Sequence, residues 1–248
     1  MLFFRNLLIS LFLFFCLPLP AFSGEALKGA TLNWEPYIGV NMPREGYVAE
    51  VVREALSAGG GYTLDIQYMP WARVVAMTKA GQFDLYFPEY YAEELKKDFL
   101  ISDAFPGGPL VFFRKKGSQI SYTKLQDLRS YKIGVVRGYV NTPEFDAATY
   151  LTKEEVTEDL HNFLKLLAGR IDLVVADQYV GLHLLRTQLP DRSQEVEILS
   201  PPLGNNDLYV CFPKKIQDAE KKLKAFNRGL KMLKESGRIQ EIMASHGF

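Results

Sequence analysis

Apolar residues recur along this chain with two different periods, which separate the segments expected to be helices from those expected to be strands. An apolar residue at every third or fourth position gives a helix one apolar face. Alternation of apolar and polar residues, or a short apolar run, indicates a strand. The first pattern predicts helices over 47–58, 71–80, 89–97, 124–128, 158–168, 178–188 and 218–235, with shorter ones starting near 141 or 142 and after 237. The second predicts strands over 31–34, 62–68, 83–87, 110–113, 132–136, 171–176, 196–199 and 208–212.

The order of these segments favours an α/β fold. Strands and helices alternate throughout, which is typical of sheets built mostly from parallel strands. The pattern starts again after Gly117, so the chain divides into two similar halves. Two α/β lobes would bring the ends of several strands to the cleft between them, where ligands commonly bind.

The first residues have the layout of a signal peptide for export. Arg5 precedes an apolar run over 7–19, and small residues follow at Ala21 and Ser23. We therefore expect residues 1–23 to be removed and the mature chain to lie in the periplasm. The apolar run is shorter than the roughly 20 residues that a membrane-spanning helix needs. A retained membrane anchor is the alternative interpretation.

The amino-acid composition argues against several classes of function. Without residues 1–23, the chain has 28 basic residues (the 29 of the whole sequence less Arg5) against 29 acidic ones. This balance gives no reason to expect nucleic acid or a membrane surface as a partner. Only Cys211 would remain, which excludes an internal disulfide. The histidines are far apart and no nucleophile or nucleotide-binding motif occurs, so we expect no metal, no cofactor and no catalytic residue.

Six short segments, in order along nearly the whole mature chain, carry a resemblance to a known family. They lie at 34–37, 80–85, 99–105, 128–138, 167–177 and 235–242, the last preceded by Asn227. Together they resemble the bacterial extracellular solute-binding proteins of family 3, the amino-acid-binding type that serves ATP-driven (ABC) importers.

The resemblance implies a two-lobed periplasmic binding protein fold of type II, with a hinge and an interlobe cleft. The first lobe would comprise residues 24–111 and 209–248, and the second residues 112–208. The implied function is that of a monomer that closes on a small polar ligand and docks on the membrane permease of an ABC importer.

The resemblance also implies particular ligand contacts. Trp34, with Tyr37 in the same segment, matches the position where this family stacks an aromatic ring on its ligand. The alternative is an aromatic side chain of the core. Asp177 follows an apolar strand, and the matching carboxylate in the family pairs with the ligand's ammonium group. An Asp at this junction equally suits the N-cap of the next helix.

A second candidate contact is the turn after the strand at 132–136. This turn contains Gly138, Tyr139, Asn141 and Thr142. Free backbone N–H groups at a helix start suit a carboxylate or another anion. The turn is therefore expected to hold an anionic group of the ligand, with an ordinary capped helix as the alternative.

The segment after the predicted strand at 83–87 departs from the family pattern. Amino-acid binders hold the ligand's α-carboxylate there with an Arg that follows small hydroxyl residues, and this chain has neither. Lys96 is the nearest cation, Glu89 stands where the family has a hydroxyl, and Tyr91 lies between them. Arg73 can take over the anionic contact or pair with Glu89, unless it is simply solvated.

These departures favour a cationic or zwitterionic polar ligand over a standard α-amino acid bound in the usual way. One other function left open is a sensory module that hands its ligand-bound state to a membrane receptor. Another is an enzyme, because a few relatives of this fold are dehydratases, and Glu89, Lys96 and Asp177 could supply acid and base. A secreted protein with a vestigial cleft is the remaining alternative.

Overall fold

The computed structural model describes residues 24–248, and the expected signal peptide at 1–23 lies outside the described residues. Its strands are β1 (Ala26–Thr31), β2 (Thr63–Tyr68), β3 (Leu85–Glu89), β4 (Phe99–Ile101), β5 (Phe105–Lys115), β6 (Lys132–Val136), β7 (Thr152–Val156), β8 (Leu173–Asp177) and β9 (Val196–Pro213). Its α-helices are α1 (Tyr47–Gly60), α2 (Trp71–Lys79), α3 (Pro143–Ala147), α4 (Asp159–Leu167), α5 (Gln178–Thr187), α6 (Ala219–Glu235) and α7 (Arg238–Ser245). Short 3-10 helices cover Pro43–Glu45, Glu93–Lys97, Leu125–Leu128 and Pro190–Glu195.

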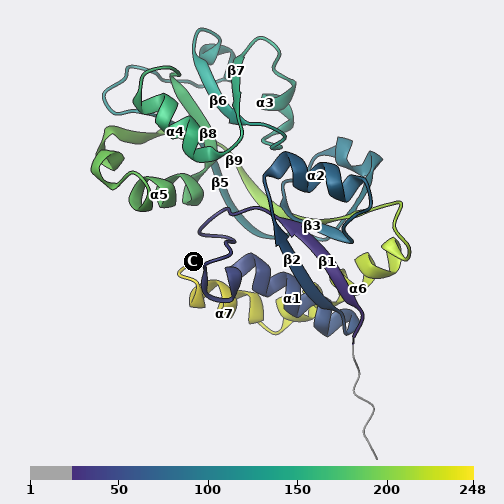
Figure 1. Cartoon of the computed structure of the whole chain (residues 1–248). Coiled ribbons are helices and arrows are strands. Elements are labelled where there is room, and N and C mark those ends of the chain that lie inside the picture. The colour runs from purple at the N-terminus through teal and green to yellow at the C-terminus, as the bar shows by residue number, and fades with distance from the viewer. Residues whose placement is uncertain (1–23) are drawn as a thin grey trace, which may run out of the picture.

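The first lobe is built around the parallel strands β2, β1 and β3. The C-terminal part of β9 extends this sheet antiparallel to β3 and also pairs with β4. Figure 1 shows α1, α6 and α7 gathered on one side of the sheet and α2 on the other. The lobe therefore contains both the beginning and the end of the described chain.

Helices α1 and α6 approach each other closely because small residues line their contact. A Cβ atom on Gly59 would lie 1.9 Å from the carbonyl oxygen of Ala225, and one on Gly229 would lie 1.9 Å from that of Ala55. No side chain fits at either glycine without moving backbone. The last long helix is thus fixed tightly against the first.

The second lobe has a sheet in the order β5, β8, β6 and β7. Strand β8 is antiparallel to β5 and parallel to β6, which is in turn parallel to β7. All residues of β8 are buried, in keeping with its apolar sequence Leu173–Ala176. Helix α4 buries its apolar face, with Phe163, Leu166 and Leu167, in this lobe.

Two antiparallel strands, β5 and β9, connect the lobes (Figure 1). Their pairing runs from Phe105 opposite Leu208 at the first lobe to Lys115 opposite Val196 in the second. The register shifts twice along this pair, between Phe105 and Gly108 and between Leu110 and Phe112. The lobe boundaries expected from sequence, at 111/112 and 208/209, fall within these two strands and stay a prediction.

Most predicted elements are confirmed within two or three residues, because their apolar periods match the faces they bury. Strand β6 has the predicted bounds, and α1, α2, α5 and α6 lie within one or two residues of theirs. Threonine 142 is the N-cap of α3, as expected for a helix that begins there. Within residues 24–248, no helix is both long and apolar enough to cross a membrane.

Several predictions about strands and helices were wrong, and the short strand β4 was not predicted. Strand β1 ends at Thr31, so the predicted strand at 31–34 lies almost wholly beyond it. The strands at 196–199 and 208–212 form one continuous β9, because Gly204, Asn205 and Asn206 between them also pair with β5. In the predicted helix at 89–97, Glu89 belongs to β3 and only Glu93–Lys97 is helical. Strand β7 was missed because its sequence, Thr-Lys-Glu-Glu-Val, has little apolar character on this sheet edge.

Candidate functional site

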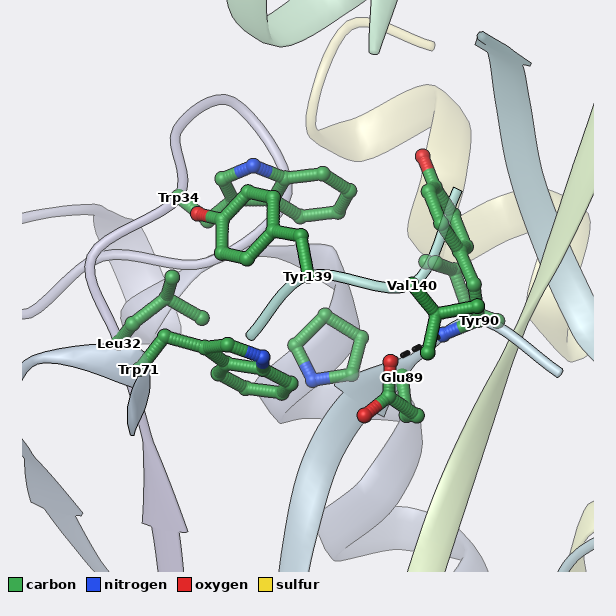
Figure 2. A pocket seen from close by; sticks show the side chains of 9 residues that line it. Leu32, Trp34, Trp71, Glu89, Tyr90, Tyr139 and Val140 are labelled. Carbon is green, nitrogen blue, oxygen red and sulfur yellow. Dashed lines mark hydrogen bonds between the residues drawn. The ribbon is translucent and has the colours of Figure 1, made fainter. Parts of the chain in front are cut away.

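Two adjoining pockets lie in the cleft between the lobes. The space that can hold water-sized atoms is about 30 Å³ in the smaller and about 440 Å³ in the larger. They share the side chains of Leu32, Trp34, Trp71 and Tyr139, so they are two adjacent parts of one site. Figure 2 shows Trp34, Trp71 and Tyr139 on one side of the smaller pocket, and Glu89 with Tyr90 on the other.

Trp34 reaches the cleft because β1 ends three residues earlier, at the carboxyl edge of the first sheet. Its ring stacks on that of Tyr37 at 4.8 Å and meets Tyr90 edge-on at 5.9 Å. Its indole N–H is buried within reach of the Asp159 carboxylate, yet it makes no hydrogen bond of normal geometry within residues 24–248. Trp34 therefore presents an aromatic face to the site, while its indole N–H stays buried near Asp159.

Asp177 ends β8 and caps α5. One carboxylate oxygen accepts hydrogen bonds from the backbone N–H groups of Tyr179 and Val180, at 2.8 and 3.2 Å. The other accepts from the hydroxyls of Tyr37 and Tyr90, both at 3.0 Å. Both tyrosines come from the first lobe, so Asp177 joins the two lobes directly. Burial raises its pKa to about 6, although all four hydrogen bonds favour the charged form.

Further contacts bring the lobes together around Asp177. The indole N–H of Trp71, on α2, donates to the carbonyl oxygen of Gly138 in the second lobe at 3.0 Å. At the rim of the larger pocket, His183 on α5 lies 3.0 Å from the carboxylate of Glu35. These side chains hold the cleft in a closed arrangement.

Glu89 lies at the end of β3 with only 4% of its surface exposed. Its carboxylate accepts hydrogen bonds from the Tyr86 hydroxyl at 3.0 Å and the Tyr90 backbone N–H at 2.9 Å. Burial raises its pKa to about 8, because neither partner carries a positive charge. The predicted ion pair with Arg73 does not form; Arg73 is exposed on α2 and lines neither pocket.

Asp159 is a candidate that the sequence interpretation missed. It is the first residue of α4, 7% exposed, and lines the larger pocket. The hydroxyl of Tyr139 donates to one of its oxygens at 3.1 Å. Burial, with the nearby charge of Asp177 as a lesser cause, raises its pKa to about 7. The signal available in the sequence was an acidic residue at the start of the predicted helix at 158–168.

The turn at 138–142 does not offer the anion site that was expected. The backbone N–H and side-chain amide of Asn141 both donate to the carboxylate of Asp146, at 2.8 and 2.9 Å. The hydroxyl of Thr142 accepts from the backbone N–H of Phe145 at 3.2 Å. These donors are satisfied within the protein, so the alternative, an ordinary capped helix, describes this turn.

Two other predicted contacts lie away from the cleft. Lys96 pairs with Glu93 at 3.0 Å and sits over the ring of Tyr91, on an exposed 3-10 turn. Tyr91 is 40% exposed, and its hydroxyl also donates to Glu93. Neither residue lines a pocket, because the chain turns outward after Tyr90. Of the predicted residues, the structure therefore brings together Trp34, Glu89 and Tyr139, with Tyr37 and Asp177 directly behind them.

The charge of the pocket walls is one-sided. The larger pocket is lined by Glu35, Glu158 and Asp159, and the smaller by Glu89. Among residues 24–248, no Lys or Arg lines either pocket, and His183 is the sole ionisable base there. No group of three or more metal-ligating side chains occurs in the described part of the chain. Chemically, the cleft offers hydrogen-bond acceptors and aromatic faces, which suit a positively charged guest.

Comparisons with known proteins agree with this architecture. No curated protein matches the chain. Among solved structures, an ancestral arginine-binding protein bound to arginine is 22% identical, with a TM-score of 0.74 over 90% of this chain and 98% of its own. The substrate-binding protein of an amino acid ABC transporter is 21% identical, with a TM-score of 0.72 over 90% and 99% of the two chains. A histidine kinase sensor domain is 19% identical, with a TM-score of 0.77 over 91% and 96%.

These structural likenesses establish the two-lobed periplasmic binding protein fold, and sequence establishes the family. The model of the bacterial extracellular solute-binding proteins, family 3, matches residues 29–247, nearly the whole described chain. The chain therefore belongs to the bacterial extracellular solute-binding proteins of family 3.

Proposed function

We propose that this protein binds a small polar molecule carrying a positive charge, a cation or a zwitterion, in the interlobe cleft. The observation that supports this most directly is the wall of the cleft, where carboxylates and aromatic rings occur without any Lys or Arg among residues 24–248. An aromatic face attracts a cation by its quadrupole, and more strongly when water is excluded. The family role of binding without chemistry leads us to propose no catalytic activity.

The proposed setting is the periplasm, after removal of residues 1–23, with delivery of the ligand to the permease of an ABC importer. The family and the amino acid transporter protein of the same fold support this role. We propose that the protein acts as a monomer, with the lobes bounded at 24–111 with 209–248 and at 112–208. Closure of the two lobes about β5 and β9 would bury the ligand, as hinged binding proteins do.

A sensory role is the second candidate. The histidine kinase sensor domain with the same fold supports it, because that domain is part of a signalling protein. Both roles need the same ligand-binding cleft and differ in the membrane partner.

A thermal-shift screen of the mature chain tests the proposal. The protein is unfolded, refolded to remove any carried ligand, and heated with amino acids, amines, small carboxylates and short peptides. A ligand at 100 times its Kd stabilises the folded state by about 2.7 kcal/mol. For a chain of this length the midpoint should rise by roughly 5–10 °C.

The expected result is a rise with cationic or zwitterionic solutes and none with purely anionic ones. A rise with anions alone contradicts the proposed ligand charge. A well-folded sample with no rise for any class contradicts the solute-binding role itself.

A further inference from the structure

We propose that Asp159, and not Asp177, is the carboxylate that receives the ligand's positive charge, and that the preferred ligand is an organic amine without a carboxylate. This inference rests on the proposed function and specifies it. It departs from the contact at Asp177 that the family resemblance implies.

The first reason is that Asp177 has no acceptor position left. A carboxylate offers about four lone-pair sites on its two oxygens. At Asp177 four donors take them, namely two backbone N–H groups of α5 and the hydroxyls of Tyr37 and Tyr90. An ammonium group would have to displace one of the contacts that hold the lobes together. Asp177 is therefore suited to closing the cleft rather than to binding the guest.

The second reason is that Asp159, unlike Asp177, accepts few hydrogen bonds from the protein. Its side chain accepts one hydrogen bond of normal geometry, from Tyr139, with the indole N–H of Trp34 and its own backbone N–H nearby, and it borders the larger pocket directly. With 7% of its surface exposed, it is largely removed from water, and no Lys or Arg of residues 24–248 pairs with it. A buried carboxylate without a counter-charge is costly, and a cation from outside the protein would relieve that cost.

The third reason is the group of aromatic rings around this carboxylate. Trp34 and Trp71 from the first lobe and Tyr139 from the second line both pockets (Figure 2). Trp71 and Tyr139 meet edge-on across the cleft, with ring centroids 6.0 Å apart. The buried indole N–H of Trp34 lies close enough to Asp159 to favour its charged form, although the two do not meet at normal hydrogen-bond geometry. Aromatic faces beside a carboxylate recognise alkylammonium groups.

The fourth reason is that a ligand carboxylate would find no partner. The helix starts of the second lobe are the usual places for an anion. There, Asp146 takes the N–H of Asn141 ahead of α3, Asp159 begins α4, and Asp177 caps α5. Asp177 thus occupies the start of α5, the Thr142 hydroxyl caps α3, and carboxylates of the chain lie beside the starts of α3 and α4. An amino acid would bring its carboxylate to an acidic wall, whereas the corresponding amine would not.

Matched pairs of probes test this by isothermal titration calorimetry on the mature protein. Each pair differs in the carboxylate: lysine and cadaverine, arginine and agmatine, and glycine betaine and choline. We expect the amine of at least one pair to bind at least roughly tenfold more tightly than its partner. Asp159→Asn should weaken binding of that amine by at least roughly tenfold. Asp191→Asn, which removes an exposed carboxylate outside the cleft, is the matched control and should change nothing.

The outcomes separate the two proposals. Binding of an amino acid as tight as that of its amine overturns this inference but leaves the solute-binding role intact. The inference is also overturned, with the solute-binding role intact, if an amine binds the Asp159→Asn variant normally but no longer binds the Asp177→Asn variant. If no member of any pair binds the wild-type protein, the cationic ligand of the proposed function also fails. If Asp159→Asn does not fold, Tyr139→Phe replaces it as the test, because it removes the hydroxyl that donates to Asp159. This variant should bind the amine severalfold more weakly. Unchanged binding contradicts the inference.

Discussion

Two parts of the cleft have opposite characters. In the closing contact, formed by Tyr37, Tyr90 and Asp177, every polar atom named above has a partner from the protein. The second part, the recognition wall, is formed by Trp34, Trp71, Tyr139 and Asp159. There the indole N–H of Trp34 has no hydrogen-bond partner at normal geometry among the described residues, and the buried carboxylate of Asp159 has one, the hydroxyl of Tyr139. The difference indicates that the two parts have separate functions: the closing contact holds the lobes together, and the recognition wall selects the ligand.

The largest effect is expected from the recognition wall. Trp34→Ala removes a buried ring that stacks on Tyr37, and should lower the free energy of unfolding by roughly 3 kcal/mol. Loss of a desolvated cation–π contact of about 2 kcal/mol should also weaken cation binding about 30-fold. Urea unfolding and calorimetry measure the two effects. Tyr150→Ala, at an exposed aromatic residue of the second lobe, is the control and should alter neither.

A smaller effect, of a different kind, is expected from the closing contact. Tyr90→Phe removes one hydroxyl donor to Asp177 and should cost about 1.5 kcal/mol of stability. Because the contact joins the lobes, the variant should open more often and lose affinity for every ligand by the same factor. Small-angle scattering and titrations with two unlike ligands check this. Affinity lost for one ligand and kept for the other would place Tyr90 in the recognition wall instead.

A third effect concerns the pH dependence of stability and is spread over several pH units. The pKa of Glu89 is raised by burial from an ordinary 4.5 to about 8, and those of Asp159 and Asp177 to about 7 and 6. Between about pH 5 and pH 8 the folded protein therefore holds protons that the unfolded chain has lost, so stability falls as the pH rises. Glu89→Gln should make this slope shallower by up to about 1 kcal/mol per pH unit.

Urea unfolding at a series of pH values measures that slope. Glu93→Gln, at an exposed carboxylate of the same segment, is the matched control. A slope unchanged by Glu89→Gln would mean that the buried carboxyl titrates near its ordinary pKa, beside Tyr86 and Tyr90.

Most of the fold, but only part of the candidate site, could be predicted from the sequence. Trp34 was selected from the family resemblance, and Asp177 from that resemblance and from its place after an apolar strand, which brings it to a sheet edge facing the cleft. Asp159 was missed because Thr-Glu-Asp reads locally as a solvated helix start, whereas its burial depends on Tyr139 and Trp34, which are distant in sequence. Glu89 was assigned to a polar helix, although β3 extends far enough to bury it. The bond between Asn141 and Asp146 depends on side-chain direction, which periodicity does not encode.

The tight contact of α1 with α6 has a consequence for biogenesis. The second lobe is one uninterrupted stretch of chain, so all its contacts can form as soon as that stretch has been synthesised. The first lobe depends on Gly229, near the end of the chain, meeting Gly59 near its beginning. Contacts so distant in sequence form slowly. We therefore expect the first lobe, although its chain begins first, to be completed last, with the face of α1 that contacts α6 exposed until α6 has been made.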